Sequence, residues 1–124
     1  MGTGESDPVT MVRIHPFAAL HADPAYAPGV AAVPYDVVSA AEAADVIRAN
    51  PRSFLRVSRA DAELPGVPPH DPAVYQRARR NLEDMVADGL LVRDSGPALY
   101  LYRVREGNTE YTGLCACVET RDYE

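Results

Sequence analysis

The sequence predicts an α+β fold, with two main helices packed on a mostly antiparallel sheet of four or five strands. Two segments carry helix start and stop signals, and residues 90–118 alternate between apolar and polar positions across Gly-containing turns. With 124 residues, the chain can bury one modest hydrophobic core. We expect a disordered tail over residues 1–10 and a single α+β domain over residues 11–124, with Met11 as an alternative start.

Composition and charge disfavour several classes of protein. The chain has 12 Lys and Arg against 18 Asp and Glu, a net charge of −6, which is the wrong sign for a protein that binds by neutralising phosphates. Nucleic acid is therefore disfavoured as a partner. No apolar run approaches the roughly 18 to 20 residues that span a bilayer, and the N-terminus lacks the pattern of a signal peptide. We expect a cytoplasmic protein without membrane contact.

The N-terminal half predicts a strand, a helix and a second strand. Residues 11–14 alternate like a short strand that Pro16 ends. After an irregular stretch, Ser39 and Glu42 have the spacing of a capping box, which predicts a helix over residues 40–49. Residues 54–58 then alternate between apolar and polar positions, which predicts the next strand.

The second helix is signalled independently at both ends. Asp71 is a favourable N-cap, Pro72 suits the first helical position, and Gly89 supplies a C-terminal stop. Residues at three- and four-residue spacing define an apolar face, and charged residues define the opposite face. The apolar face comprises Tyr75, Ala78, Leu82, Met85 and Val86, and the polar face Arg77, Arg79, Arg80, Glu83 and Asp84. We expect the apolar face to lie on the strands that follow.

Those strands are predicted to form an antiparallel meander. Residues 90–92 begin a strand, residues 98–105 give a second in which leucines and tyrosines alternate, and residues 111–118 give a third. The loop over residues 106–109 contains a glycine and joins the last two strands as a hairpin.

The two cysteines predict neither a disulfide nor a metal site. Cys115 and Cys117 flank Ala116 on a predicted strand, where a mutual disulfide would be strained. The three histidines of the chain are far apart and lack the spacing of metal ligands: His15, His21 and His70. We therefore expect buried, reduced thiols and no metal.

Several stretches together resemble the DUF1015 family, a bacterial and archaeal domain of unknown function often labelled SpoOJ/ParA/ParB/RepB. The stretches that carry the resemblance are residues 14–20 (IHPFAAL), 34–39 (PYDVVS), 50–55 (NPRSFL), 99–103 (LYLYR) and 112–116 (TGLCA). The resemblance implies a distant relation to the ParB and sulfiredoxin-like fold, whose members include nucleotide-using enzymes, amino-acid kinases and DNA-partition proteins.

Family members are usually longer, and they continue into a polar segment after the positions that match residues 121–124. The resemblance therefore implies that this chain is a truncated N-terminal part of a nucleotide- or small-molecule-binding protein and is inactive alone. The reaction, if there is one, and the cofactor stay open.

The loop before the first helix is the first candidate ligand site. Tyr35 and Asp36 precede Ser39 at the start of the helix, and free N–H groups at a helix N-terminus favour an anionic ligand. A nucleotide or another phosphorylated small molecule is therefore a candidate partner. In the alternative interpretation Asp36 forms an Asx turn, Tyr35 packs on the core and Ser39 only caps the helix.

Arg13 and His15 are the second candidate site. A histidine that titrates near neutral pH could exchange protons with a substrate if it met Asp36. In the alternative interpretation, a lone histidine before a proline is a surface residue.

A noncatalytic DNA-associated or protein-interaction module is the rival hypothesis, because a helix followed by a hairpin resembles a winged helix in outline. Two observations oppose DNA binding. Arg79 and Arg80 are matched four residues later by acidic residues, and the hairpin carries Glu106 and Glu110 where a wing should be basic.

Overall fold

The computed structural model describes residues 11–123, which divide into two compact units. The helical unit is Leu20–Arg93, and the strand unit combines residues 11–19 with residues 94–123. The tail predicted for residues 1–10 lies outside the described residues, and the prediction of one domain over residues 11–124 stays a prediction.

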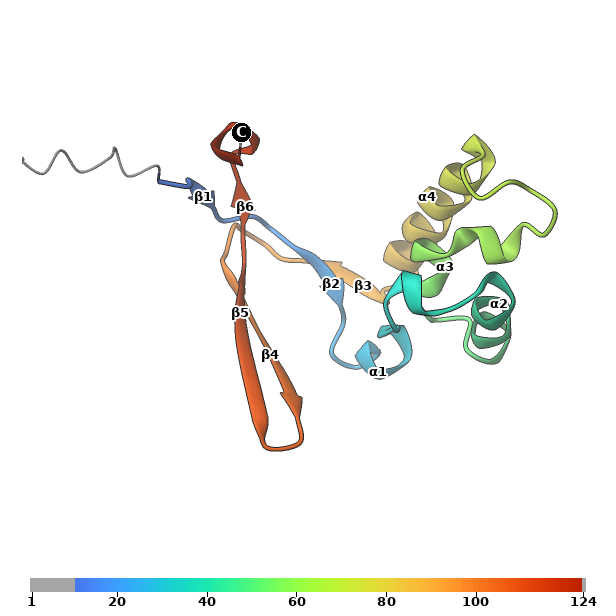
Figure 1. The fold of residues 1–124 in the computed structure, drawn as a ribbon, viewed down its shortest axis with the longest axis horizontal. Helices are drawn as coiled ribbons and strands as arrows, with labels where there is room; N and C mark the ends of the chain where they lie inside the picture. The colour runs from blue at the N-terminus through green and yellow to red at the C-terminus, as the bar shows by residue number, and fades with distance from the viewer. Residues whose placement is uncertain (1–10, 124) are drawn as a thin grey trace, which may run out of the picture. The chain divides into compact units, whose positions relative to one another are not determined.

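The structure confirms the α+β class (Figure 1). The helices are α1 (Ala27–Val30), α2 (Ala40–Ala49), α3 (Leu55–Ser58) and α4 (Pro72–Ala87), with short 3-10 turns η1 (Tyr35–Val37), η2 (Ala60–Glu63) and η3 (Thr120–Tyr123). The strands are β1 (Ile14–His15), β2 (Leu20–Ala22), β3 (Leu91–Arg93), β4 (Tyr100–Glu106), β5 (Thr109–Cys115) and β6 (Cys117–Val118). No helix in the described part of the chain is both long and apolar enough to cross a bilayer.

The strands pair antiparallel, as expected, but they do not form one sheet. The described strands form three two-stranded ladders, β1 with β6, β2 with β3, and β4 with β5. The prediction that β3 opens a meander with the hairpin is therefore wrong. β3 pairs instead with β2, a strand that the sequence did not signal, and Asp23 N–H extends this ladder by donating to the Leu90 carbonyl at 2.9 Å.

Helix α4 has the ends that the sequence predicts. The Asp71 carboxylate accepts the Ala73 N–H at 2.9 Å, Pro72 occupies the first turn, and Gly89 has a φ of 75°. Within the helical unit, the buried face packs against α3, η2 and β3. The core of the helical unit gathers Val30, Met85, Leu90 and Leu91, with Leu20, Ala22, Phe54, Val57 and Leu82 against it.

The apolar face predicted for α4 is only partly correct. Tyr75 is 59% exposed and Val86 is 43% exposed, whereas Val74, Asn81 and Met85 are buried. The buried stripe is thus rotated by about one residue from the predicted one. The prediction is wrong here because it counts only apolar residues, whereas the polar residue Asn81 lies in the middle of the buried stripe.

Asn81 is buried because polar groups surround it. The Asn81 amide donates to the Arg56 carbonyl at 2.7 Å and to Glu63 Oε1 at 3.2 Å, and the Asn81 Oδ1 accepts from Arg56 at 3.1 Å. Glu63 also pairs with Arg77, which is partly buried and not on a fully solvated face. This cluster joins α4 to α3 and η2.

The strand predicted over residues 54–58 is wrong, because this segment forms helix α3. The Ser53 hydroxyl accepts the Leu55 N–H at 3.2 Å at the start of the helix, and the Ser58 hydroxyl donates to the Phe54 carbonyl at 3.3 Å at its end. Leu55 is fully buried. A five-residue pattern fits both periods, and packing against α4 decides for the helix.

The strand unit contains a long hairpin of β4 and β5, joined by the turn at Gly107 and Asn108 (Figure 1). The Phe17 ring packs near the Tyr100 ring, with centroids 5.1 Å apart. The Tyr100 hydroxyl accepts the Ala19 N–H at 2.9 Å and donates to Asp94. These contacts join the segment after β1 to the base of the hairpin.

The prediction of buried thiols is wrong. Cys115 and Cys117 are free, as expected, but both are exposed. The strands that carry them belong to two-stranded ladders in a unit whose described residues include no helix of the α type, so an apolar stretch there does not imply burial.

Truncating the core side of α4 should cost much more stability than truncating its exposed side. Met85 is 1% exposed and Val86 is 43% exposed. We expect Met85→Ala to lower the free energy of unfolding by about 2–5 kcal/mol, and Val86→Ala to change it by about 0.5 kcal/mol or less. Denaturant unfolding monitored by circular dichroism measures both, and equal losses would contradict the observed packing.

Candidate ligand-binding site

Two hollows open beside η1 in the helical unit, and both are large enough for a small molecule. The apolar hollow has a volume of about 440 Å³ and the polar hollow about 500 Å³. Tyr35 and Ser58 line both. The apolar hollow is otherwise lined by Leu20, His21, Ala22, Ala27, Val30, Ala31, Ala32, Val33, Pro34, Phe54 and Leu91.

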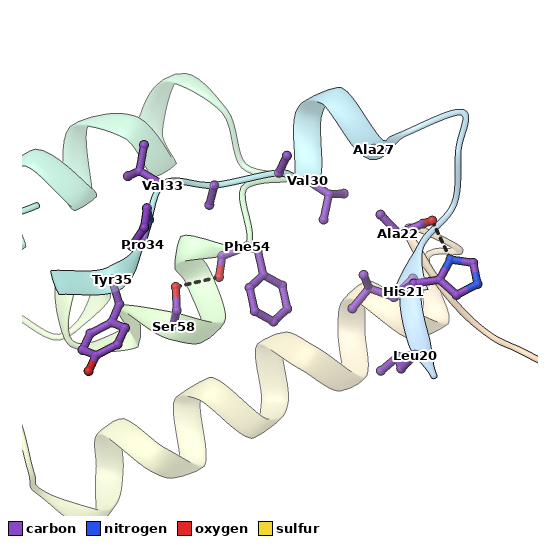
Figure 2. Close-up of a pocket in the computed structure, with 13 residues that line it drawn as sticks. Leu20, His21, Ala22, Ala27, Val30, Val33, Pro34, Tyr35, Phe54 and Ser58 are labelled. Carbon is purple, nitrogen blue, oxygen red and sulfur yellow. Dashed lines mark hydrogen bonds between the residues drawn. The ribbon is translucent and has the colours of Figure 1, made fainter. Parts of the chain in front are cut away.

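The apolar hollow is built around the Phe54 ring. Figure 2 shows this ring between the β2 side of the hollow, with Leu20 and Ala22, and the other end, with Tyr35 and Ser58. The His21 ring hydrogen-bonds to the Ala22 carbonyl at 2.9 Å. The lining is therefore suited to a flat apolar group, with hydrogen-bonding groups at its ends.

The polar hollow lies between η1, the junction of α3 with η2, and the first half of α4. Its lining combines ionisable and hydroxyl side chains with apolar ones: Tyr35, Asp36, Val38, Val57, Ser58, Arg59, Ala60, Asp61, Pro69, His70, Val74, Tyr75 and Ala78. With neutral histidine, the formal charge of this lining is −1, from Asp36 and Asp61 against Arg59. A ligand that offers hydroxyl or amino groups fits this charge better than a bare phosphate.

Arg59 holds the backbone of η1 in place. The guanidinium donates to the Tyr35 carbonyl at 3.1 Å and to the Val38 carbonyl, and it pairs with Asp61 at 3.0 and 2.9 Å. Its side chain is only 17% exposed. The hydrogen bond from Arg59 lowers the pKa of Asp61, and the same bond raises the pKa of Arg59. Both groups are therefore charged at neutral pH and are already paired.

Tyr35 and Asp36 are presented to solvent on this anchored turn. Tyr35 is 63% exposed, so it does not pack on the core as the alternative interpretation required. Within the described residues no hydrogen bond reaches the Asp36 carboxylate, so the Asx turn is not formed either. Neither side chain therefore has the structural role that the alternative interpretation gave it.

Ser39 has the structural role of its alternative interpretation. The Ser39 hydroxyl accepts the Glu42 N–H at 3.1 Å, and Glu42 accepts the Ser39 N–H at 3.3 Å. This capping box confirms the predicted start of α2. Ser39 lines neither hollow, so its assignment as a ligand-binding residue stays a prediction without a contact that supports it.

Arg13 and His15 belong to the strand unit, where acidic partners hold both. Arg13 binds Asp122 through its side chain at 2.8 and 3.1 Å and through its backbone N–H at 2.9 Å. His15 Nε2 lies 3.0 Å from Glu119 Oε1. These pairs join the start of the described chain to β6 and η3. His15 belongs to the strand unit and Asp36 to the helical unit, so the meeting of the two that the sequence hypothesis needs stays a prediction.

Three residues of the polar hollow carry no signal for a site in the sequence: Arg59, His70 and Tyr75. Arg59 carries no local signal, because its partners in η1 are 21 and 24 residues away. His70 has no role in the sequence analysis beyond its exclusion as a metal ligand, and the helical spacing places Tyr75 on the apolar face of the second helix. The structure brings these two together, with His70 Nδ1 3.2 Å from the Tyr75 hydroxyl at the rim of the hollow.

Among the described residues, no group of three or more His, Cys, Asp or Glu side chains could hold a metal ion. The model for the family described as "Protein of unknown function (DUF1015)" matches residues 14–124. The chain belongs to the DUF1015 family. Comparisons with curated proteins and with solved structures found no match. The function of this DUF1015 chain must therefore be argued from its own site.

Breaking the Arg59–Asp61 pair should destabilise this DUF1015 chain at neutral pH. Asp61→Asn removes a partly buried charged partner, and we expect a loss of about 1–3 kcal/mol in the free energy of unfolding. Asp45→Asn is the matched control, because Asp45 pairs with Arg48 at an exposed site, and this substitution should cost about 0.5 kcal/mol or less.

The same pair predicts a pH dependence. The pKa of Asp61 is lowered in the folded state, so its contribution is fully present above the unfolded-state pKa of about 3.9. It is lost as the pH falls through the lowered pKa of the folded state. The unfolding free energy of the unsubstituted chain should thus fall more steeply below about pH 4 than that of Asp61→Asn. Parallel pH profiles in urea titrations would contradict this assignment.

Proposed function

We propose that this chain is a small-molecule-binding module of the cytoplasm, and that its ligand has a flat apolar part and hydroxyl or amino groups, as a nucleotide has. One observation carries the proposal. The Tyr35 ring and the Asp36 carboxylate are exposed and lack structural partners among the described residues, although Arg59 fixes the backbone beneath them. Exposed side chains without partners add little to the stability of the protein. A ligand that binds them, however, loses little entropy, because the backbone of the site is already ordered.

The apolar part of the ligand would lie against Tyr35 and Phe54. Aromatic side chains bind nucleobases by stacking, which contributes about 1–3 kcal/mol per base. Tyr35 lines both hollows, so a ligand that stacks there would extend from the apolar into the polar hollow.

The polar part of the ligand would lie near Asp36 and His70. A carboxylate without a partner accepts hydrogen bonds from sugar hydroxyls or amines, and a histidine either donates or accepts. Arg59 is already engaged with Asp61 and with η1, so it does not provide a free cation for phosphate. The geometry thus favours the nucleoside part of a nucleotide as the recognised group.

The ParB and sulfiredoxin-like relation that the sequence resemblance implies is part of this proposal, because that group includes nucleotide-using enzymes. Membership of the DUF1015 family establishes only an uncharacterised domain. The interpretation of the chain as a fragment that is inactive alone also stays a prediction. A DNA-associated role is less favoured, since Arg79 pairs with Glu83 at 3.0 Å and the hairpin carries Glu106 and Glu110.

A ligand screen by thermal unfolding tests the proposed function. ATP, ADP, adenosine, phosphoserine and duplex DNA are the probes, because any ligand that prefers the folded state raises its stability, by about 2.7 kcal/mol at 100 times the dissociation constant. We expect stabilisation by adenosine and its phosphates. Stabilisation by DNA alone that weakens steeply with salt would replace this proposal with the DNA-associated one.

Substitution of Tyr35 makes the test specific to the site. Tyr35→Ala should weaken binding by about 1–3 kcal/mol, while Val37→Ala should leave it unchanged. Val37 is the matched control because it lies in the same turn, is 61% exposed and lines neither hollow. Calorimetric titration measures both. Equal affinities for the two variants, or no response to any probe, would overturn the proposal.

A further inference from the structure

The β4–β5 hairpin has two free edges in the described part of the chain. The two strands pair with each other over seven residue pairs, from Tyr100 with Cys115 to Glu106 with Thr109, and with no other strand. Both faces are open, since Leu101 is 77% exposed and Tyr111 is 61% exposed. An isolated two-stranded hairpin is at best marginally stable in water, so this one gains most from a further strand.

The turn determines which backbone groups point outward. Gly107 has a φ of 59° and Asn108 has no positive φ, as in a two-residue turn with glycine first. The pair that flanks such a turn is hydrogen-bonded, and the pairs then alternate. Arg103 and Thr112 are three pairs away from Glu106 and Thr109, so they form a non-hydrogen-bonded pair. Their N–H and C=O groups therefore point to the outer edges, of β4 and β5 respectively.

The β5 edge lacks the features that usually prevent pairing with another chain. Proteins protect edge strands with proline, bulges or unpaired charges. β5 contains no proline, and its register with β4 is unbroken. Its one charged residue, Glu110, is neutralised by Arg103 at 3.1 Å and Arg105 at 2.9 Å.

We propose that two copies of this chain pair edge to edge through β5, antiparallel about a two-fold axis at Thr112, to form a four-stranded sheet. A two-fold axis pairs the same strand of both copies, so each residue of β5 lies opposite a β5 residue of the second copy. At the centre of β5 this places Thr112 opposite Thr112, a favourable cross-strand pair. The equivalent pairing through β4 would place Arg103 opposite Arg103, and like charges directly opposite each other are destabilising.

The other positions of β5 fit the same register. Tyr111 of one copy lies opposite Gly113 of the other, and the Tyr102 ring already lies where a side chain on Gly113 would be. Tyr102 and the second copy's Tyr111 would therefore enclose the glycine from both sides. Glu110 lies opposite Leu114, and its ion pairs with the β4 arginines leave no unpaired charge at the interface.

Disulfide trapping tests the register directly. In a hydrogen-bonded antiparallel pair the Cα atoms are about 5.5 Å apart, a separation that a disulfide can bridge. In a background of Cys115→Ser and Cys117→Ser, the Thr112→Cys variant should be converted by oxidised glutathione to a covalent dimer, with release of two reduced glutathiones per bridge. Arg103→Cys in the same background is the matched control and should form no covalent dimer, because residue 103 lies on the β4 edge, away from the proposed interface.

Sedimentation velocity of the full chain over a wide concentration range gives the second measurement. We expect a monomer–dimer equilibrium that Thr112→Pro abolishes, because proline removes the outward N–H from the β5 edge. Arg103→Pro makes the same change at the β4 edge and should leave dimerisation intact, while circular dichroism verifies that both variants fold. A monomer at all concentrations, or a dimer that traps through Arg103→Cys and not through Thr112→Cys, would overturn the proposal.

Discussion

The helical unit depends on the hydrogen bonds that the buried side chain of Asn81 makes. Its amide donates to the Arg56 carbonyl and to Glu63, and its oxygen accepts from the Arg56 guanidinium. Burial acts to raise the pKa of Glu63, but hydrogen bonds from Arg56 and Arg77 outweigh it and lower the pKa, so the carboxylate stays charged. Each group in this cluster satisfies another, and losing one would leave a buried polar partner unpaired, which costs more than the bond contributes.

This cluster also determines where the candidate site forms. Asn81 and Glu63 fix α3 and η2 against α4, and Arg59 is the residue at the junction of α3 with η2. Its guanidinium can reach the carbonyls of η1 only while that junction is held. Asn81 therefore determines indirectly where Tyr35 and Asp36 lie: it holds the junction, and Arg59 at the junction holds η1. A ligand site that is anchored in this way has less freedom to lose when it binds.

Local signals predicted those parts of the fold that local physics decides. Ser39 with Glu42, Asp71 and Gly89 cap helices through backbone groups two or three residues away, so their patterns are complete in the sequence. Long-range contacts decide the rest. Residues 54–58 fit either a strand or a helix until α4 packs on them. Tyr35 and Asp36 were found because they precede a helix. Arg59 reaches the η1 segment across 21 and 24 residues, and Asn81 reaches its partners across 18 and 25 residues, so no local pattern could reveal either role.

An apolar, β-prone segment has two possible outcomes, and the strand unit shows the second. Such a segment is buried when a helix face remains to cover it. The apolar stripe of α4, however, is already used by α3, η2 and β3. The sequence pattern of β5 predicts that the segment forms a strand, but it does not predict which strand or helix packs against it. Within the strand unit, the outward backbone groups of β5 pair with no other strand and its apolar side chains are exposed. The same pattern that predicts a core strand therefore also fits an edge that another strand completes.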